Sequence, residues 1–211
     1  AVRATELELS TDGPGGVGVD VAWKGDDDSV ITVVRGQRQT RREVLHGQDT
    51  IQVTGRTLQV LREEGLKSVA VDVGGIGAGV YDNLHAASGA LGLNVIGVNF
   101  GARADDETLY IDKAAEMWWQ LREELRLGTF QTLSGDEQIA QMTSRKCALD
   151  KKGRIQLEKK DDLRKRGLPS PDQVDSLVLA REAQRQHDSL DLIVVTAEAR
   201  AEEDQAVWRS L

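Results

Sequence analysis

The stretch from Gly16 to Asp20 restricts the folds open to this chain more than any other part of its sequence. It reads Gly-Val-Gly-Val-Asp, and a polar run over residues 24–28 and a second run rich in β-branched residues follow it. Two such runs on either side of a Gly/Asp turn predict a β-hairpin, with strands at about 17–23 and 29–35. Asp20 is therefore expected inside a buried strand. A carboxylate there is costly unless it is paired, protonated or bound to a metal.

The next elements predict an α/β fold with a mixed sheet. In chain order we expect a third strand near 42–45, a helix over about 49–64 closed by Gly65, a buried strand at 68–73, a helix over 80–91 and a buried strand at 94–98. Antiparallel hairpin strands thus precede a β-α-β unit. That order favours antiparallel and parallel strands in one sheet, with helices on its faces.

The second half of the chain predicts two long helices and a small hairpin. The expected elements are a helix over 111–127 that ends at Gly128, a β-hairpin within 142–158 that turns at 150–153, and a helix over 171–186. The apolar stripe of the last helix is interrupted at Arg181, so its second half is expected to be solvated. Trp118 and Trp119 are adjacent and cannot share one helix face. We expect one in the core and the other towards a partner.

Composition limits the class of protein. A chain of 211 residues can hold one sizeable domain, and no run approaches the ~18 apolar residues of a membrane helix. Its single cysteine, Cys147, excludes internal disulfides and disfavours a cysteine zinc site. The net charge of −8 argues against a uniformly basic nucleic-acid binder, but residues 145–166 hold ten Lys or Arg against four acids. This segment is a local basic patch.

Acidic side chains recur where strands end and where the last helix begins. Asp20 and Asp72 interrupt apolar strands, and Asp172 and Asp175 lie three apart on one helix face after the cap formed by Ser170. Carboxylates that converge without cysteine or paired histidines suit hard divalent cations such as Mg²⁺ or Mn²⁺. Singly, each acid is more often a turn former or a helix cap. The combination predicts a metal site.

These motifs occur in the order found in a known family. The series is Gly18-Val19-Asp20 with Gly25-Asp26-Asp27, then Val71-Asp72-Val73-Gly74-Gly75-Ile76-Gly77-Ala78-Gly79, then Lys113-Ala114-Ala115-Glu116-Met117, then Gly153-Arg154 to Lys160-Asp161-Asp162, then Ser170-Pro171-Asp172-Gln173-Val174-Asp175. It resembles the C-terminal nuclease domain of tailed-phage large terminase subunits over about residues 16–183. Each motif is weak alone, and the ordered set is specific.

The resemblance implies an RNase H-like fold and metal-dependent cutting of concatemeric double-stranded DNA during genome packaging. Two Mg²⁺ or Mn²⁺ ions would be held by Asp20, Asp72 and Asp175, with Asp172 adjacent. We favour Asp175 over Asp172 as the principal ligand on the helix. Two ions ~4 Å apart can activate a water and stabilise the transferring phosphate.

Composition marks the two ends of the chain: the polar, glycine-rich residues 1–15 are expected to be a linker or flexible start, and 189–211 a charged tail. Residues 16–188 between them would be the nuclease domain that the resemblance implies. The implied partners are DNA, the packaging ATPase domain of the same subunit, the portal and the small terminase subunit, in the host cytoplasm and with no membrane. The ATPase motif Gly-x-x-x-x-Gly-Lys-Ser/Thr does not occur in this sequence, so no motor activity is expected of it.

Two further features concern ligands. The glycines of residues 74–79 are similar to a dinucleotide-binding loop, but the acidic residue expected further on is missing. We therefore predict tight strand-to-helix packing, which lets a DNA backbone or a metal approach Asp72, and no bound dinucleotide. The candidate phosphate contacts are the basic residues in and after the small hairpin, Lys151, Lys152, Arg154, Lys159 and Lys160. A Holliday-junction resolvase and a non-catalytic docking module of a packaging motor are the alternative functions.

Overall fold

The computed structural model describes residues 9–22 and 28–186, and five strands in it form one mixed sheet in the order β3-β2-β1-β4-β5. The strands are β1 (Gly15–Asp20), β2 (Ser29–Arg35), β3 (Arg38–Leu45), β4 (Ser68–Asp72) and β5 (Asn94–Val98). β2 pairs antiparallel with both β1 and β3, whereas β4 pairs parallel with β1 and β5. The predicted mixed sheet is confirmed. β1 differs from the prediction because it ends at Asp20 and not at residue 23.

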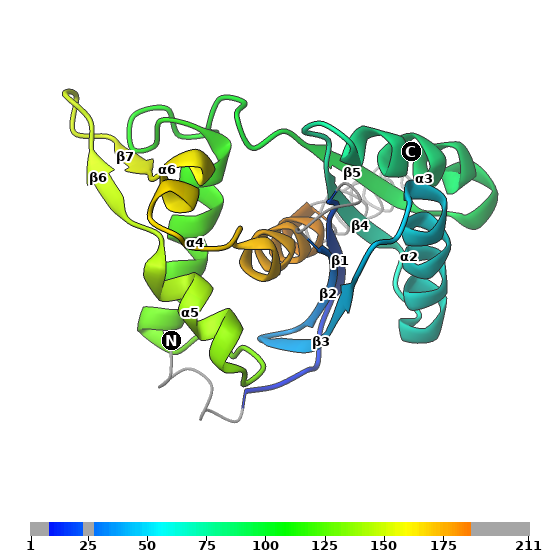
Figure 1. Ribbon diagram of the computed structural model, residues 1–211. Helices are drawn as coiled ribbons and strands as arrows, with labels where there is room; N and C mark the ends of the chain where they lie inside the picture. The colour runs from blue at the N-terminus through cyan, green and yellow to red at the C-terminus, as the bar shows by residue number, and fades with distance from the viewer. Residues whose placement is uncertain (1–8, 23–27, 187–211) are drawn as a thin grey trace, which may run out of the picture.

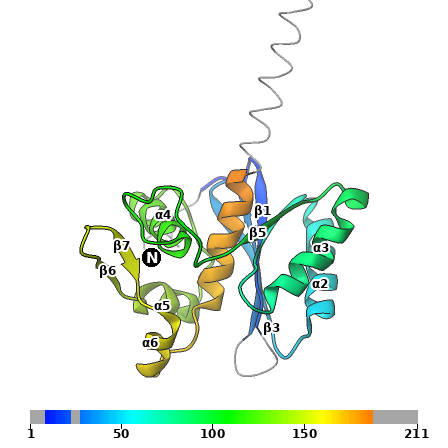
Figure 2. The same cartoon turned by 90° about the horizontal axis from the view of Figure 1, so that it is seen from above.

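Helices cover both faces of this sheet (Figures 1 and 2). α2 (Thr50–Glu64) and α3 (Gly77–Leu91) lie on one face, where they pack on the valines of β1 and β4. The helix of residues 172–186 lies on the other face, and α4 (Lys113–Leu127) packs against its outer side. The predicted ends of α2 and α4 hold, because Gly65 and Gly128 both adopt the left-handed conformation that closes a helix.

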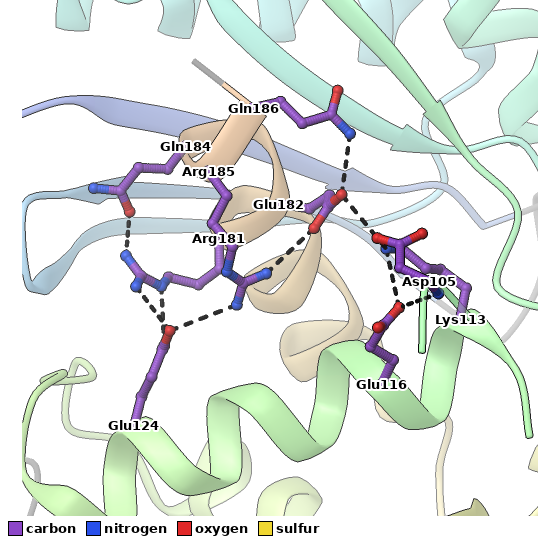
Figure 3. Close-up of polar contacts among 9 residues, drawn as sticks. All are labelled: Asp105, Lys113, Glu116, Glu124, Arg181, Glu182, Gln184, Arg185 and Gln186. Carbon is purple, nitrogen blue, oxygen red and sulfur yellow. Dashed lines mark hydrogen bonds and ion pairs between the residues drawn. The ribbon is translucent and has the colours of Figure 1, made fainter. Parts of the chain in front are cut away.

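The second half of the helix of residues 172–186 is buried, so the prediction of a solvated half is wrong. Glu182 and Gln184 are 8% and 3% exposed. The helix lies between the sheet and α4, and its charged groups are covered because they are paired (Figure 3). Arg181 Nη2 lies 2.9 Å from a carboxylate oxygen of Glu124, and Glu182 lies 3.7 Å from Lys113 Nζ. This half of the helix is therefore buried through ion pairs, whereas the prediction considered only an apolar stripe.

A smaller unit follows α4 along the chain. It comprises α5 (Asp136–Ser144), the predicted hairpin β6 (Cys147–Leu149) and β7 (Ile155–Leu157), and α6 (Lys160–Lys165). The hairpin is confirmed, whereas neither α5 nor α6 was predicted. The residues that α5 buries are Gln138 and Gln141, so it has no apolar stripe to detect.

Parts of the predicted organisation fall outside the described residues. These are the beginning of the proposed linker, residues 1–8, and the charged tail over 189–211. The rest of the proposed linker contacts the sheet, since the carbonyls of Ser10 and Pro14 accept hydrogen bonds from Gln37 and Gly36. Within the described part of the chain, no helix is long and apolar enough to cross a membrane.

Candidate active site

Two glycines of β1 let the helix of residues 172–186 approach the sheet backbone to backbone. A Cβ atom on Gly18 would lie 2.0 Å from the carbonyl oxygen of Ser176 and 2.2 Å from the amide nitrogen of Ala180. A Cβ on Gly16 would lie 2.5 Å from the carbonyl oxygen of Ala180. Alternate residues of a strand share one face, so Asp20 points to the same side as these glycines. The close approach therefore brings the first turn of the helix beside Asp20.

Asp72 ends the strand next to β1. Val19 pairs with Val71 in the parallel register, so Asp20 and Asp72 occupy equivalent positions at neighbouring strand ends and face the same side. Gly74 donates its backbone N–H to Asp72 Oδ1 at 2.9 Å. A Cβ on Gly77 would lie 1.9 Å from the carbonyl oxygen of Asp72. The glycine-rich loop thus allows α3 to begin directly on the end of β4, as its predicted packing role requires.

Lys160 lies among the acidic side chains. Its Nζ is 2.7 Å from Asp175 Oδ2, 3.8 Å from Asp20 Oδ2 and 3.9 Å from Asp172 Oδ1. The predicted acids from β1 and the last helix therefore meet around one ammonium group. This lysine was expected to contact phosphate, and nothing in the local sequence distinguishes it from Lys159. Only the fold, which brings the first residue of α6 beside Asp20 and Asp175, reveals its surroundings.

The cluster changes how these groups titrate. Burial raises the pKa of Asp20 well above its ordinary value; Lys160 opposes this, and the neighbouring carboxylates add to it. Burial also raises the pKa of Asp72, which the Gly74 hydrogen bond partly offsets. For Lys160, burial disfavours the ammonium form, but the carboxylates of Asp175 and Asp20 outweigh it and raise the pKa. Lys160 is therefore charged at neutral pH and offsets the negative charge of the acids.

Asp175 is the most enclosed of the four acids, with 1% of its surface exposed. Its Oδ1 accepts a 2.7 Å hydrogen bond from Trp118 Nε1 and lies 3.6 Å from Arg145 Nη1. Asp172 is less buried and accepts a hydrogen bond from the hydroxyl of Ser170. Sequence reasoning placed one of the two adjacent tryptophans in the core, and the structure shows that this one is Trp118. Nothing in the sequence indicated that Trp118 contacts Asp175.

The residues present fit a hard divalent cation by their chemistry. All four candidate ligands supply carboxylate oxygens, as Mg²⁺ and Mn²⁺ require. Asp20 Oδ2 is buried and, within the described residues, accepts no hydrogen bond, so this oxygen has capacity for a ligand. The described residues contain no group of three or more His, Cys, Asp or Glu side chains close enough to hold a metal as they stand. Lys160 lies at the centre of the acids, so its ammonium group supplies the positive charge there.

The predicted phosphate contacts separate into different environments. Lys151 and Lys152 are exposed at the tip of the β6–β7 hairpin, and Lys159 is exposed after β7. Arg154 instead forms an ion pair with Asp150 at 2.8 Å, across the base of the turn. The structure therefore places three of the five basic residues on the surface, one in the hairpin turn and one, Lys160, among the acids.

The mixed sheet with helices on both faces matches the RNase H-like fold of solved structures. Neither known family models nor curated protein sequences match this chain. Solved structures do match it, and among them are nuclease domains of phage large terminases.

Three matched structures come from different phages. The nuclease domain of the large terminase subunit gp2 of bacterial virus Sf6 matches with a TM-score of 0.74 and 16% identity, over 84% of this chain and 91% of that one. The large terminase nuclease of thermophilic phage G20c with bound magnesium gives 0.60 and 17% identity, over 80% of each chain. The Thermus phage P74-26 domain gives 0.56 and 16% identity, over 82% and 81%. The expected resemblance is confirmed for the fold.

Proposed function

We propose that this protein is a metal-dependent endonuclease that cuts double-stranded DNA during the packaging of a phage genome. The observation that carries this proposal is the convergence of Asp20, Asp172 and Asp175 on one ammonium group, with Asp72 on the adjacent strand end. The structural relatives support it, because Sf6 and G20c nuclease domains have been solved with manganese and with magnesium.

Each acid has a distinct role in this proposal. Asp20, at the end of the central strand, would anchor the metal through its Oδ2, which is buried and accepts no hydrogen bond from the described residues. Asp72 and Asp175 would bind from either side, with Asp172 at the more open edge. Two bound Mg²⁺ or Mn²⁺ ions would supply a nucleophilic water and stabilise charge on the phosphate. No side chain is required as a nucleophile.

The wider setting of this activity is part of the same proposal. On the strength of the sequence resemblance, its partners would be a packaging ATPase domain, the portal and the small terminase subunit, in the host cytoplasm. DNA would reach the acids past the exposed lysines of the β6–β7 hairpin, which supply positive charge on an acidic protein.

A plasmid-nicking assay across a metal series tests the proposal. We expect nicked and linear products with Mg²⁺ or Mn²⁺ and none in excess chelator. Comparison of linear duplex with a four-way junction separates a packaging nuclease from a resolvase, since only a resolvase would prefer the junction. Cleavage that persists in chelator, or no cleavage and no thermal stabilisation with any divalent ion, would contradict the proposal and favour a docking module.

Lys160 is expected to compete with metal for the acids. Lys160→Met should lower the metal-free stability by about 2 kcal/mol, because the carboxylates lose a charged hydrogen-bond donor. The gain in melting temperature on adding Mn²⁺ should then be larger than in the parent protein. Differential scanning fluorimetry with and without Mn²⁺ measures both effects. The neighbouring exposed Lys159→Met is the control, and identical behaviour of the two variants would refute this role.

The hairpin lysines are expected to contribute to DNA affinity through charge alone. The double variant Lys151→Ala/Lys152→Ala should bind duplex DNA more weakly. The slope of log affinity against log salt should fall by about 1.8 if each lysine neutralises one phosphate. Fluorescence anisotropy at several salt concentrations measures the slope. Arg154→Ala should instead disturb the turn itself, since it breaks the ion pair with Asp150 that holds the turn. An unchanged slope in the double variant would exclude these phosphate contacts.

A further inference from the structure

We propose that Trp118 and Arg145 are positioning residues, which hold the Asp175 carboxylate in the orientation that binds metal. This inference rests on the proposed function and adds to it two residues outside the acidic cluster. Neither is a metal ligand, and neither would touch DNA or the reacting atoms. Their role would be to select which oxygen of Asp175 is offered to the cation.

The indole of Trp118 determines how Asp175 is oriented. Nε1 donates to Oδ1 at 2.7 Å, and both side chains are buried, with 8% and 1% exposed. The other oxygen, Oδ2, faces the centre of the cluster, where Lys160 Nζ lies 2.7 Å away. A rotation of the carboxylate would break the bond to the indole, and α4 holds that indole firmly in the core. The hydrogen bond therefore directs Oδ2 to the place where a positive charge is bound.

Arg145 contacts both members of the indole–carboxylate pair. Its guanidinium carbon lies 4.7 Å from the centre of the Trp118 ring, and Nη1 lies 3.6 Å from Asp175 Oδ1. The side chain is only 8% exposed. Its Nε donates at 3.0 Å to the carbonyl oxygen of Glu158, which directly follows β7. Arg145 thus joins the base of the basic hairpin to the tryptophan and to the acid.

A role in metal binding and a role in packing alone predict different results. If Trp118 only fills the core, any aromatic ring of similar shape should serve. If it orients Asp175, the N–H group itself is needed, because partners that orient metal ligands typically change metal affinity by about 10- to 100-fold when they are removed. Trp118→Phe keeps a ring and removes the donor, so it separates the two roles.

The neighbouring tryptophan provides the control. Trp119 is partly exposed on the same helix, and the guanidinium of Arg122 lies over its ring at 4.2 Å. Manganese affinity is measured by electron paramagnetic resonance, which counts free Mn²⁺ during a titration and needs no DNA. We expect Trp118→Phe to bind Mn²⁺ about 10-fold or more weakly than the parent protein. Trp119→Phe should remain within about twofold of the parent, well below the range seen for orienting partners.

A second variant keeps the inference testable if Trp118→Phe does not fold, as judged by circular dichroism. Arg145→Lys retains the charge but loses the planar group that stacks on the indole. It should weaken Mn²⁺ binding several-fold. Parent-like affinity in folded Trp118→Phe, or an equal loss in Trp119→Phe, would overturn the inference alone. A parent protein that binds no Mn²⁺ would overturn the proposed function, and this inference with it.

Discussion

Asp20→Asn is expected to abolish DNA cleavage and leave the fold intact. The variant removes the negative charge at the end of the central strand while it keeps the size of the side chain. A bound metal contributes several kcal/mol to the stabilisation of charge in the transition state, so the loss should be on the order of 10³-fold or more. Plasmid nicking in Mn²⁺ measures the rate, and circular dichroism reports the fold.

The same substitution should not lower the metal-free stability at neutral pH. Burial raises the pKa of Asp20, so the folded state binds a proton more readily than the unfolded state does. The stability that comes from this group is therefore full below the unfolded pKa near 3.8 and is lost as pH rises through the higher folded pKa. Asparagine cannot ionise and avoids this loss. Its melting temperature at pH 7 without metal should equal or exceed that of the parent.

Asp161→Asn is the matched control for this experiment, because Asp161 is 82% exposed and directly follows Lys160. It should cleave DNA like the parent. Full activity in Asp20→Asn, or inactivity in both variants, would be incompatible with the assigned role of Asp20.

Gly18→Ala should destabilise the protein strongly. The new Cβ would lie 2.0 Å and 2.2 Å from main-chain atoms of Ser176 and Ala180, and these cannot turn away as a flexible side chain could. The helix must move off the sheet, at a cost of about 3 kcal/mol. A chain of this size should then melt about 6–12 °C lower. Because the same movement separates Asp175 from Asp20, cleavage should be impaired even below the melting temperature.

Gly89→Ala gives the opposite expectation for the same chemical change. Gly89 lies in α3, and a Cβ there would meet no heavy atom within 4 Å. Alanine is the better helix former, so this variant should be up to about 1 kcal/mol more stable. Thermal melts of the two variants together distinguish the close approach at Gly18 from a general effect of alanine. Equal melting temperatures would contradict the backbone packing described for β1.

The sheet and its neighbouring helices were predictable because their local patterns agree with their positions. β2 and β5 have the expected bounds, and glycine closes α2 and α4 as expected. α5 was missed because the side chains that it buries are glutamines, so hydrophobic periodicity is silent there. The burial of the last helix was missed because Glu124, on α4, pairs with Arg181. The residue pattern of one helix does not reveal which charged residue on another helix will pair with it.

The acids of the site could be found from sequence, whereas their neighbours could not. Asp20 and Asp72 stand out because they interrupt apolar strands. Lys160 looks like one more member of a basic run, and Trp118 looks like an ordinary core residue. Their contacts with Asp175 join residues that are 15 and 57 positions apart, and only the packing of α6 and α4 brings them together.

The close packing of a helix on Gly16 and Gly18 affects which sequence changes such a protein can tolerate. The spacing between the acid on the strand and the acid on the helix is determined by main-chain atoms, which every amino-acid sequence shares. Neighbouring side chains can therefore be exchanged widely while that spacing persists, provided that the two smallest residues stay. Redesign of exposed positions elsewhere would leave this spacing unchanged, whereas a larger residue at Gly16 or Gly18 would not.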